Sequence, residues 1–225
     1  MGNIKDNLEN VKKRISDACE RSGRNPDEIT LLAVTKTVSV ENISKVMELG
    51  VDQLGENRVQ ELLSKCDSLP DATWHIIGHL QTNKVKSIIG KTKLIHSVDS
   101  LRLAEEIGKQ SAAKGIVTDV LLEVNVSGEE SKYGMTLDFV DEALENCSKI
   151  SGIYVKGLMT MAPLGAEEDE VRRIFSSLFK KYVDISAKKY DNVTMEYLSM
   201  GMSNDFEIAI EEGANIVRVG RGLFQ

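Results

Sequence analysis

The sequence predicts an α/β protein that folds as a single (β/α)8 barrel, and three observations support this prediction. Short apolar runs rich in β-branched residues, too brief for helices, recur along the whole chain. Amphipathic stretches separate these runs, and this alternation is typical of parallel strands covered by helices. The chain has 225 residues, which matches the size of such a barrel. An open, doubly wound parallel sheet is the alternative architecture.

Eight apolar runs are expected to form the strands. They span residues 30–36, 51–55, 74–78, 94–98, 117–126, 153–161, 195–200 and 216–220. Amphipathic helices are expected at residues 3–21, 40–49, 101–114 and 206–212, with a further helix that begins near residue 166. The chain stops five residues after the eighth strand, which leaves no length for a final covering helix. We therefore expect the opening helix to cover that strand.

Composition argues against several classes of partner. Acidic side chains outnumber basic ones by 35 to 28, the formal net charge is -7, and the longest basic run covers only residues 12–14. We expect no nucleic-acid partner from this balance. No apolar stretch approaches the roughly 18 residues of a membrane-spanning helix, and the polar N-terminus does not resemble a signal peptide. We expect a cytoplasmic protein without a membrane partner.

The chain shows no sign of a division into parts. Only three prolines occur, and no Pro/Ser-rich linker separates one segment from another. The three cysteines form no C-x-x-C pair, which suits a reducing compartment better than a disulfide framework. The expected organisation is one domain over residues 1–225.

A lysine and two glycine turns fall where such a barrel places its functional groups, at the C-terminal ends of strands. Lys36 ends the first strand and is a candidate nucleophile, although a strand-end lysine that only reaches solvent is the plainer interpretation. The turn 199–205 contains a glycine and two serines and suits an anion; alternatively, Asn204 and Glu207 form an ordinary capping box. The turn 220–222 follows the eighth strand, the other half of the usual phosphate position.

Arg218 lies within the eighth strand and alternates with two valines, so it is expected to face either the barrel interior or the helices. A buried guanidinium cannot lose its charge and needs an acceptor. A structural ion pair with Glu123 or Glu196 and a bound acceptor are equally good explanations. Asn125 alternates with apolar residues beside Glu123 and is a further polar partner for Arg218 in the lumen.

Together, a strand-end lysine, a phosphate cradle and a buried arginine suggest a phosphorylated aldehyde held as a Schiff base, the binding mode of pyridoxal 5′-phosphate. A lysine amine must be neutral to react with an aldehyde, and removal from water favours the neutral form. We therefore expect the apolar first strand to keep the amine of Lys36 out of water.

Five ordered motifs resemble the YggS/PROSC family of pyridoxal phosphate homeostasis proteins, and together they extend from the first strand to the C-terminus. The motifs are AVTKT (33–37), GENRVQE (55–61), WHIIGHLQTNK (74–84), SMGMSNDF (199–206) and VRVG (217–220).

The resemblance implies a barrel like that of alanine racemase, without the racemase's second, C-terminal β-domain. It implies that Lys36 carries pyridoxal 5′-phosphate as an internal aldimine, that Asn57 lies beside the ring and that Arg218 faces the pyridine nitrogen. It also implies that the phosphate is held by Ser199, Ser203 and Gly220.

The family resemblance implies a binding protein that buffers the cofactor or delivers it to apoenzymes. The alternative is a racemase or related enzyme that uses the same Schiff base. Racemisation needs an acid and a base on opposite faces of the substrate, and an unprotonated pyridine opposite an arginine is a poor electron sink. We therefore expect binding with little turnover. Without a second domain to mediate pairing, a monomer is expected.

Other polar residues receive less specific interpretations. His75 and His79 have metal-ligand spacing, but they fall in a strand and in the loop after it, so no metal site is expected. His96 is expected to be a hydrogen-bonded histidine of the barrel. Lys132 and Tyr133 follow the fifth strand; an exposed loop is the plainer reading, and a role in cofactor transfer is the alternative.

Overall fold

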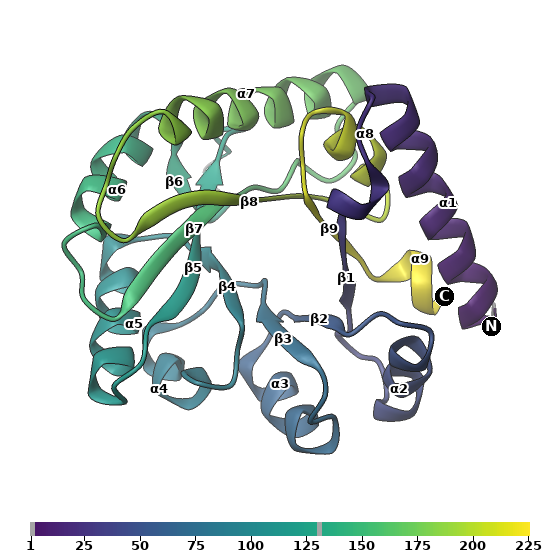
Figure 1. Ribbon diagram of the computed structural model, residues 1–225, viewed down its shortest axis with the longest axis horizontal. Coiled ribbons are helices and arrows are strands. Elements are labelled where there is room, and N and C mark those ends of the chain that lie inside the picture. The colour runs from purple at the N-terminus through teal and green to yellow at the C-terminus, as the bar shows by residue number, and fades with distance from the viewer. Residues whose placement is uncertain (1–2, 130–131) are drawn as a thin grey trace.

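The protein is a closed barrel of parallel strands surrounded by helices (Figure 1), seen in a computed structural model that describes residues 3–129 and 132–225. The strands follow one another around the barrel in the order β4-β3-β2-β1-β9-β8-β7-β5, and β5 pairs with β4 to close it. Their bounds are β1 Thr30–Val34, β2 Gln53–Glu56, β3 Thr73–Ile76, β4 Leu94–Val98, β5 Thr118–Asn125, β7 Ile153–Met159, β8 Val193–Met202 and β9 Ile216–Val219. This closure confirms the barrel and excludes the open sheet.

A two-residue strand, β6 (Met135–Thr136), adds to the edge of β5 and was not expected from the sequence. It pairs in parallel with Val124 and Asn125 near the C-terminal end of β5. The loop that begins after β5 therefore returns to the mouth of the barrel before the chain enters the next helix.

Helices form the outer layer. Their bounds are α1 Ile4–Ser22, α2 Val40–Glu48, α3 Val59–Lys65, α4 Val85–Ile88, α5 Leu101–Ala113, α6 Val140–Cys147, α7 Glu168–Ser186, α8 Phe206–Glu211 and α9 Arg221–Phe224. The longest of them carry many charged residues, and within the described part of the chain none has both the length and the apolar character needed to cross a bilayer.

The opening helix, which was expected to cover the eighth strand, packs on the helices before and after that strand, α8 and α9. In Figure 1, α1 runs beside α8 and α9, and Arg14 of α1 makes two hydrogen bonds to Glu207 of α8, at 3.2 and 2.7 Å. Asn7 donates to the backbone carbonyl of Leu223 at 3.1 Å. The expectation that no helix follows the eighth strand is wrong, because α9 forms there. Its four residues are too few to show helical periodicity in a sequence.

Two apolar layers form the core because side chains alternate between the two faces of each strand. One layer lies between strands and helices and includes Leu54, Leu122 and Phe175. The other fills the barrel lumen and consists of Leu32, Val34, Ile77, Leu94, Leu121, Met159 and Ile216. This alternation decides which polar side chains point into the lumen.

Candidate functional site

Lys36 and Asn57 lie at the C-terminal mouth of the barrel, after neighbouring strands. Leu32 and Val34 of β1 face the lumen, and the same alternation brings Lys36 to the lumen side. Val34 pairs with Gly55 of β2, and Asn57 follows Gly55 by the same two residues. The register therefore places Lys36 and Asn57 just beyond the ends of two neighbouring strands at this mouth.

Lys36 is exposed, so the expectation that its amine is kept out of water is wrong for this structure. Strand β1 ends at Val34, and Thr35 is the last buried residue before the mouth. The amine therefore stands beyond the last apolar layer. This position can favour condensation by holding the amine close to a bound aldehyde, and not by burying the amine.

The backbone beside Lys36 is strained and held in place. Thr37 adopts φ 60°, the left-handed region that β-branched residues avoid. Its backbone N–H donates to Glu61 Oε2 at 3.0 Å, and its hydroxyl donates to the carbonyl of Lys36 at 2.6 Å. Such conformations cost on the order of 1–3 kcal/mol and persist only where surrounding contacts enforce them. Glu61 therefore helps to set the direction of the Lys36 backbone.

A buried ion pair on the helix side of β1 supports the same turn. Lys65 Nζ lies 2.7 Å from Glu56 Oε1 and donates to the carbonyl of Thr35 at 2.8 Å. The hydroxyl of Thr35 donates to the same Glu56 oxygen at 2.7 Å. The pair of Lys65 with Glu56 was not predicted, because a spacing of nine residues gives no local signal. The i,i+4 spacing of Lys65 with a second carboxylate, Glu61, 3.5 Å away, was the available sign that Lys65 is paired.

Ser203 and two backbone amides form a small cradle between the two glycine turns. The hydroxyl oxygen of Ser203 accepts from the backbone N–H of Gly220 at 3.3 Å and of Gly222 at 3.4 Å. Both bonds are long, so these N–H groups are suited to a stronger, charged acceptor. The structure thus brings together Ser203 and Gly220, two of the three residues expected at a phosphate.

The alternative interpretation of turn 199–205 as a capping box is wrong. The N-cap of α8 is Asp205, whose carboxylate accepts from the backbone N–H of Met202. Gly201 adopts φ 88°, and a Cβ there would lie 2.5 Å from the Cβ of Ala209. The turn therefore needs a glycine and leaves the hydroxyl of Ser203 free to face the second turn.

Ser199 is not part of this cradle. Its hydroxyl is fully buried in the lumen, where it accepts from Arg218 Nη1 at 2.6 Å and lies 2.9 Å from His96 Nδ1. The side chains of β8 alternate, so Ser199 faces the lumen between Leu198 and Met200, which face the helices. The structure groups Ser199 with Arg218 rather than with Ser203 and Gly220.

Arg218 faces the lumen, but neither expected carboxylate pairs with it. Its other contact is the carbonyl of Thr160, 2.9 Å from Nη2. Glu196 points outward and pairs with Lys156 at 2.7 Å. Burial lowers the pKa of Arg218 to about 10, opposed by the charges of Asp205 and Glu123. Arg218 therefore stays charged at neutral pH, and it donates hydrogen bonds to two uncharged acceptors, Ser199 Oγ and the carbonyl of Thr160.

Glu123 is buried in the lumen-facing row of β5, two residues beyond Leu121. Burial, and then the nearby charge of Asp99, raise the pKa of Glu123 to about 7, against the opposing charge of Arg218. The stability that this raised pKa contributes is present below the unfolded value of 4.5 and is lost as the pH rises through 7. Ionised Glu123 therefore destabilises the fold above neutral pH.

We expect Glu123→Gln to increase the free energy of unfolding at pH 8.5 by up to about 3 kcal/mol, because the variant no longer holds an ionised carboxylate in the lumen. The gain should shrink toward pH 5, where the glutamate is already protonated. Urea unfolding of both proteins at the two pH values measures this difference. A gain of equal size at both values would contradict the assigned titration.

Two of the histidines bond to each other, and the third has a different partner. His75 and His96 are buried, and His75 Nδ1 lies 3.0 Å from His96 Nε2. His96 is therefore the hydrogen-bonded barrel histidine that was expected. His79 Nδ1 lies 2.8 Å from Asp99 Oδ2, and its ring stacks on Tyr133 with centroids 3.9 Å apart. Within residues 3–129 and 132–225, no three potential metal-binding side chains come together.

The loop after β5 reaches the mouth, as expected. Tyr133 is exposed there, and Lys132 Nζ lies 3.9 Å from Glu129 Oε2. The stacking of Tyr133 on His79 connects this loop to the loop after β3. The possible role of Lys132 and Tyr133 in cofactor transfer stays a prediction.

Comparison with known proteins assigns the family. The model of the family described as "Alanine racemase, N-terminal domain" matches residues 2–225. The chain belongs to this family. A relative from Aquifex aeolicus, named pyridoxal phosphate homeostasis protein, is 46% identical over 99% of this chain and 97% of its own length. The resemblance to the YggS/PROSC proteins is thereby confirmed.

Solved structures of similar chains show the same fold. The crystal structure of an unknown protein from Bifidobacterium adolescentis has a TM-score of 0.95, with 38% identity over 98% of this chain and 94% of that chain. PipY of Synechococcus elongatus PCC7942, solved with PLP bound, has a TM-score of 0.83, with 32% identity over 96% of this chain and all of that one.

The residues at the mouth fit a phosphorylated pyridine aldehyde. The side-chain oxygen of Asn57 is buried and has no hydrogen-bond partner, although buried polar atoms almost always have one. Ser203, Gly220 and Gly222 offer hydrogen bonds to an anion, and Lys36 offers an amine. The family resemblance and the local chemistry therefore point to the same end of the barrel.

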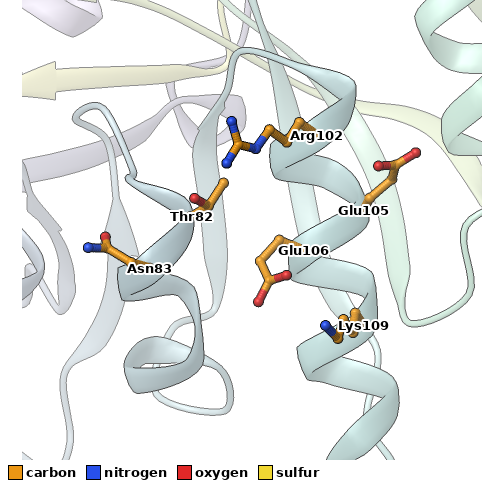
Figure 2. Close-up of a pocket in the computed structure, with 6 residues that line it drawn as sticks. All are labelled: Thr82, Asn83, Arg102, Glu105, Glu106 and Lys109. Atoms are coloured by element: carbon orange, nitrogen blue, oxygen red, sulfur yellow. The ribbon is translucent and has the colours of Figure 1, made fainter.

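A hollow lies on the outer surface between α5 and the short 3-10 helix Thr82–Lys84 (Figure 2). Figure 2 shows Arg102 extending toward Thr82, with Glu106 and Lys109 on the following turns of α5. Side chains of both charge signs line this open groove, and none of the predicted site residues does. The mouth of the barrel is the better candidate for the site of this family member.

Proposed function

We propose that this protein binds pyridoxal 5′-phosphate at the mouth of its barrel and serves the homeostasis of this cofactor. The observation that carries the proposal is that Lys36 and the Ser203–Gly220 cradle lie at the same end of one barrel. The bound cofactor of PipY and the name of the Aquifex aeolicus relative support it. We further propose that the protein works in the cytoplasm and supplies the cofactor to apoenzymes.

We assign each predicted residue a role toward the cofactor. The aldehyde of the cofactor condenses with amines, and Lys36 is the proposed point of covalent attachment. Ser203 and the N–H groups of Gly220 and Gly222 hold the phosphate, and Asn57 lies beside the ring. Arg218 donates toward the pyridine nitrogen, where a permanently charged donor disfavours protonation of the ring.

Ser199 receives a different role from the one predicted. Its hydroxyl is already engaged by Arg218 and His96 inside the lumen, so we propose that it orients Arg218 instead of binding phosphate. The expected phosphate contact thus rests on Ser203 and the two glycine amides.

We propose that the protein holds the cofactor and does not turn over amino acids. Relatives of the chain are named homeostasis proteins, and an unprotonated ring opposite Arg218 stabilises negative charge poorly. Incubation with L- and D-alanine in deuterium oxide tests this. Sustained deuterium incorporation at the α-carbon would favour the racemase alternative.

Equilibrium binding of pyridoxal 5′-phosphate and of pyridoxal tests the proposed site. The phosphate ester should bind much more tightly, and Ser203→Ala should weaken its binding by about ten- to a hundredfold, because a hydrogen bond to a charged acceptor contributes about 1.5–3 kcal/mol. Binding of pyridoxal should hardly change in this variant. Equal affinity of the two compounds for the unaltered protein would exclude the proposed phosphate cradle.

A further inference from the structure

A chain of side-chain hydrogen bonds crosses the lumen from β2 to β9. Gln53 Oε1 lies 3.0 Å from His75 Nε2, and His75 Nδ1 lies 3.0 Å from His96 Nε2. His96 Nδ1 lies 2.9 Å from Ser199 Oγ, which lies 2.6 Å from Arg218 Nη1. Four of the five residues are buried, and Gln53 is partly exposed at the start of its strand. The chain thus connects five strands through the interior of the barrel.

The chain has one direction, and the amide at its partly exposed end sets it. Gln53 Nε2 donates to Asp52 Oδ1 at 3.2 Å, so Gln53 Oε1 is left to accept from His75 Nε2–H. His75 Nδ1 then accepts from His96 Nε2–H, and His96 Nδ1 accepts the hydroxyl hydrogen of Ser199. Ser199 Oγ in turn accepts from Arg218, which can only donate. The orientation of the Gln53 amide thereby assigns the tautomer of both histidines.

Both histidines are neutral, as this direction requires. Burial lowers the pKa of His75 to about 4, and burial together with His75 and Arg218 lowers the pKa of His96 well below its usual value. A proton added to either ring would place two donors face to face at one link of the chain. The chain of hydrogen bonds therefore contains two buried titratable rings, and both are uncharged.

We propose that Gln53, His75, His96 and Ser199 are positioning residues that fix the Arg218 guanidinium in the direction of the cofactor's ring nitrogen. The inference rests on the proposed function and extends it to residues that do not touch the cofactor. The carbonyl of Thr160 holds the second nitrogen of the guanidinium at 2.9 Å. Because the guanidinium is planar and rigid, these two contacts determine where its other N–H groups point.

Removal of one hydrogen bond in the chain should alter the contact of Arg218 with Ser199 by changing the tautomer of His96. His75→Phe fills the space but removes the acceptor of His96 Nε2–H. A buried N–H without a partner is costly, so His96 should move its hydrogen to Nδ1 and donate to Ser199. Ser199 Oγ would then accept from both His96 and Arg218, and its own hydrogen would lose its acceptor, so its contact with Arg218 would weaken. His75→Gln is the matched control, because an amide offers both an acceptor and a donor.

Nitrogen-15 NMR of the histidine rings in protein without added ligand tests the direction of the chain. We expect both buried rings to carry hydrogen on Nε2, His75→Phe to move the hydrogen of His96 to Nδ1, and His75→Gln to leave it on Nε2. Hydrogen on Nδ1 of His96 in the unaltered protein would overturn the proposal. This measurement needs no cofactor, so it remains decisive even if the proposed function fails.

Two ligands test whether the chain acts through the ring nitrogen. One is pyridoxal 5′-phosphate, and the other is its analogue with a C–H group in place of the ring nitrogen. His75→Phe should weaken binding of the first by about three- to tenfold, the value of one hydrogen bond, and leave the second unchanged. His75→Gln should restore binding. An equal loss for both ligands would show a merely structural role and overturn the proposal.

A second variant covers the case in which His75→Phe does not fold. Gln53→Met removes the last acceptor at the partly exposed end of the chain, where an altered side chain is tolerated more easily. It should weaken binding of the nitrogen-containing ligand only, in the same direction and by a smaller factor. If Gln53→Met bound both ligands as tightly as the unaltered protein, this result would contradict the proposed chain. Failure of the unaltered protein to bind either ligand would instead reject the proposed function.

Discussion

Lys36→Ala is expected to abolish covalent retention of pyridoxal 5′-phosphate completely. The variant removes the amine that is proposed to condense with the aldehyde, and Lys132, in the loop that reaches the same mouth, is not expected to replace it. Borohydride reduction followed by mass spectrometry of the intact protein and of its peptides measures the loss. In the unaltered protein, the added mass should lie on the peptide that contains Lys36.

Two control variants separate chemistry from charge and from folding. Lys36→Arg keeps the positive charge at the mouth but cannot form the bond, so it should behave like Lys36→Ala. Lys86→Ala removes an exposed lysine on α4 and should retain the full covalent mass. Because Lys36 is exposed, neither substitution there should lower the unfolding temperature. Covalent mass on another lysine of the unaltered protein would contradict the assignment.

Lys65→Met is expected to lower the free energy of unfolding by about 3–5 kcal/mol, since it leaves a buried carboxylate without its cation. Glu56 is fully buried, and one of its two oxygens has no hydrogen-bond partner even with Lys65 in place. The remaining oxygen depends on Lys65 and on the hydroxyl of Thr35. Urea unfolding monitored by circular dichroism measures this effect.

The double variant Glu56→Gln with Lys65→Met should recover much of the loss, because no buried charge is then left unpaired. Lys45→Met is the matched control: Lys45 pairs with Glu41 at the same 2.7 Å, but both side chains are largely exposed. Its cost should stay below about 1 kcal/mol, as is usual for surface ion pairs. If Lys65→Met lowered the free energy of unfolding by no more than Lys45→Met does, the buried pair would not support the turn before Lys36.

The strands could be predicted because parallel strands covered on both faces need continuous apolar runs, as Leu94–Val98 shows. Helix α9 and the two-residue strand β6 were missed, since elements of four and two residues leave no periodic signal. The expectation that the amine of Lys36 is kept out of water was also wrong, because Lys36 is exposed. An apolar run shows that a strand is buried, but it does not show where along the strand the burial ends.

The roles of Ser199 and Ser203 illustrate what the sequence left undecided. Ser199 lies near the end of the expected seventh strand and Ser203 lies in the glycine-containing turn after it, so both suit an anion site by composition. Their alternation and the closure of the barrel send one hydroxyl to His96, 103 residues away in the chain, and the other to the amides of Gly220 and Gly222. No local pattern encodes such a difference.

The sequence alone determined the barrel and the place of Lys36 after its first strand, because these follow from periodicities and strand ends that are local in the chain. Only the tertiary structure decided which polar side chains meet inside the lumen and that the amine of Lys36 lies in water. The physical reason is that closing a ring of strands brings distant residues within hydrogen-bond distance. The partner that each buried donor finds depends on strand register, which short-range patterns do not specify.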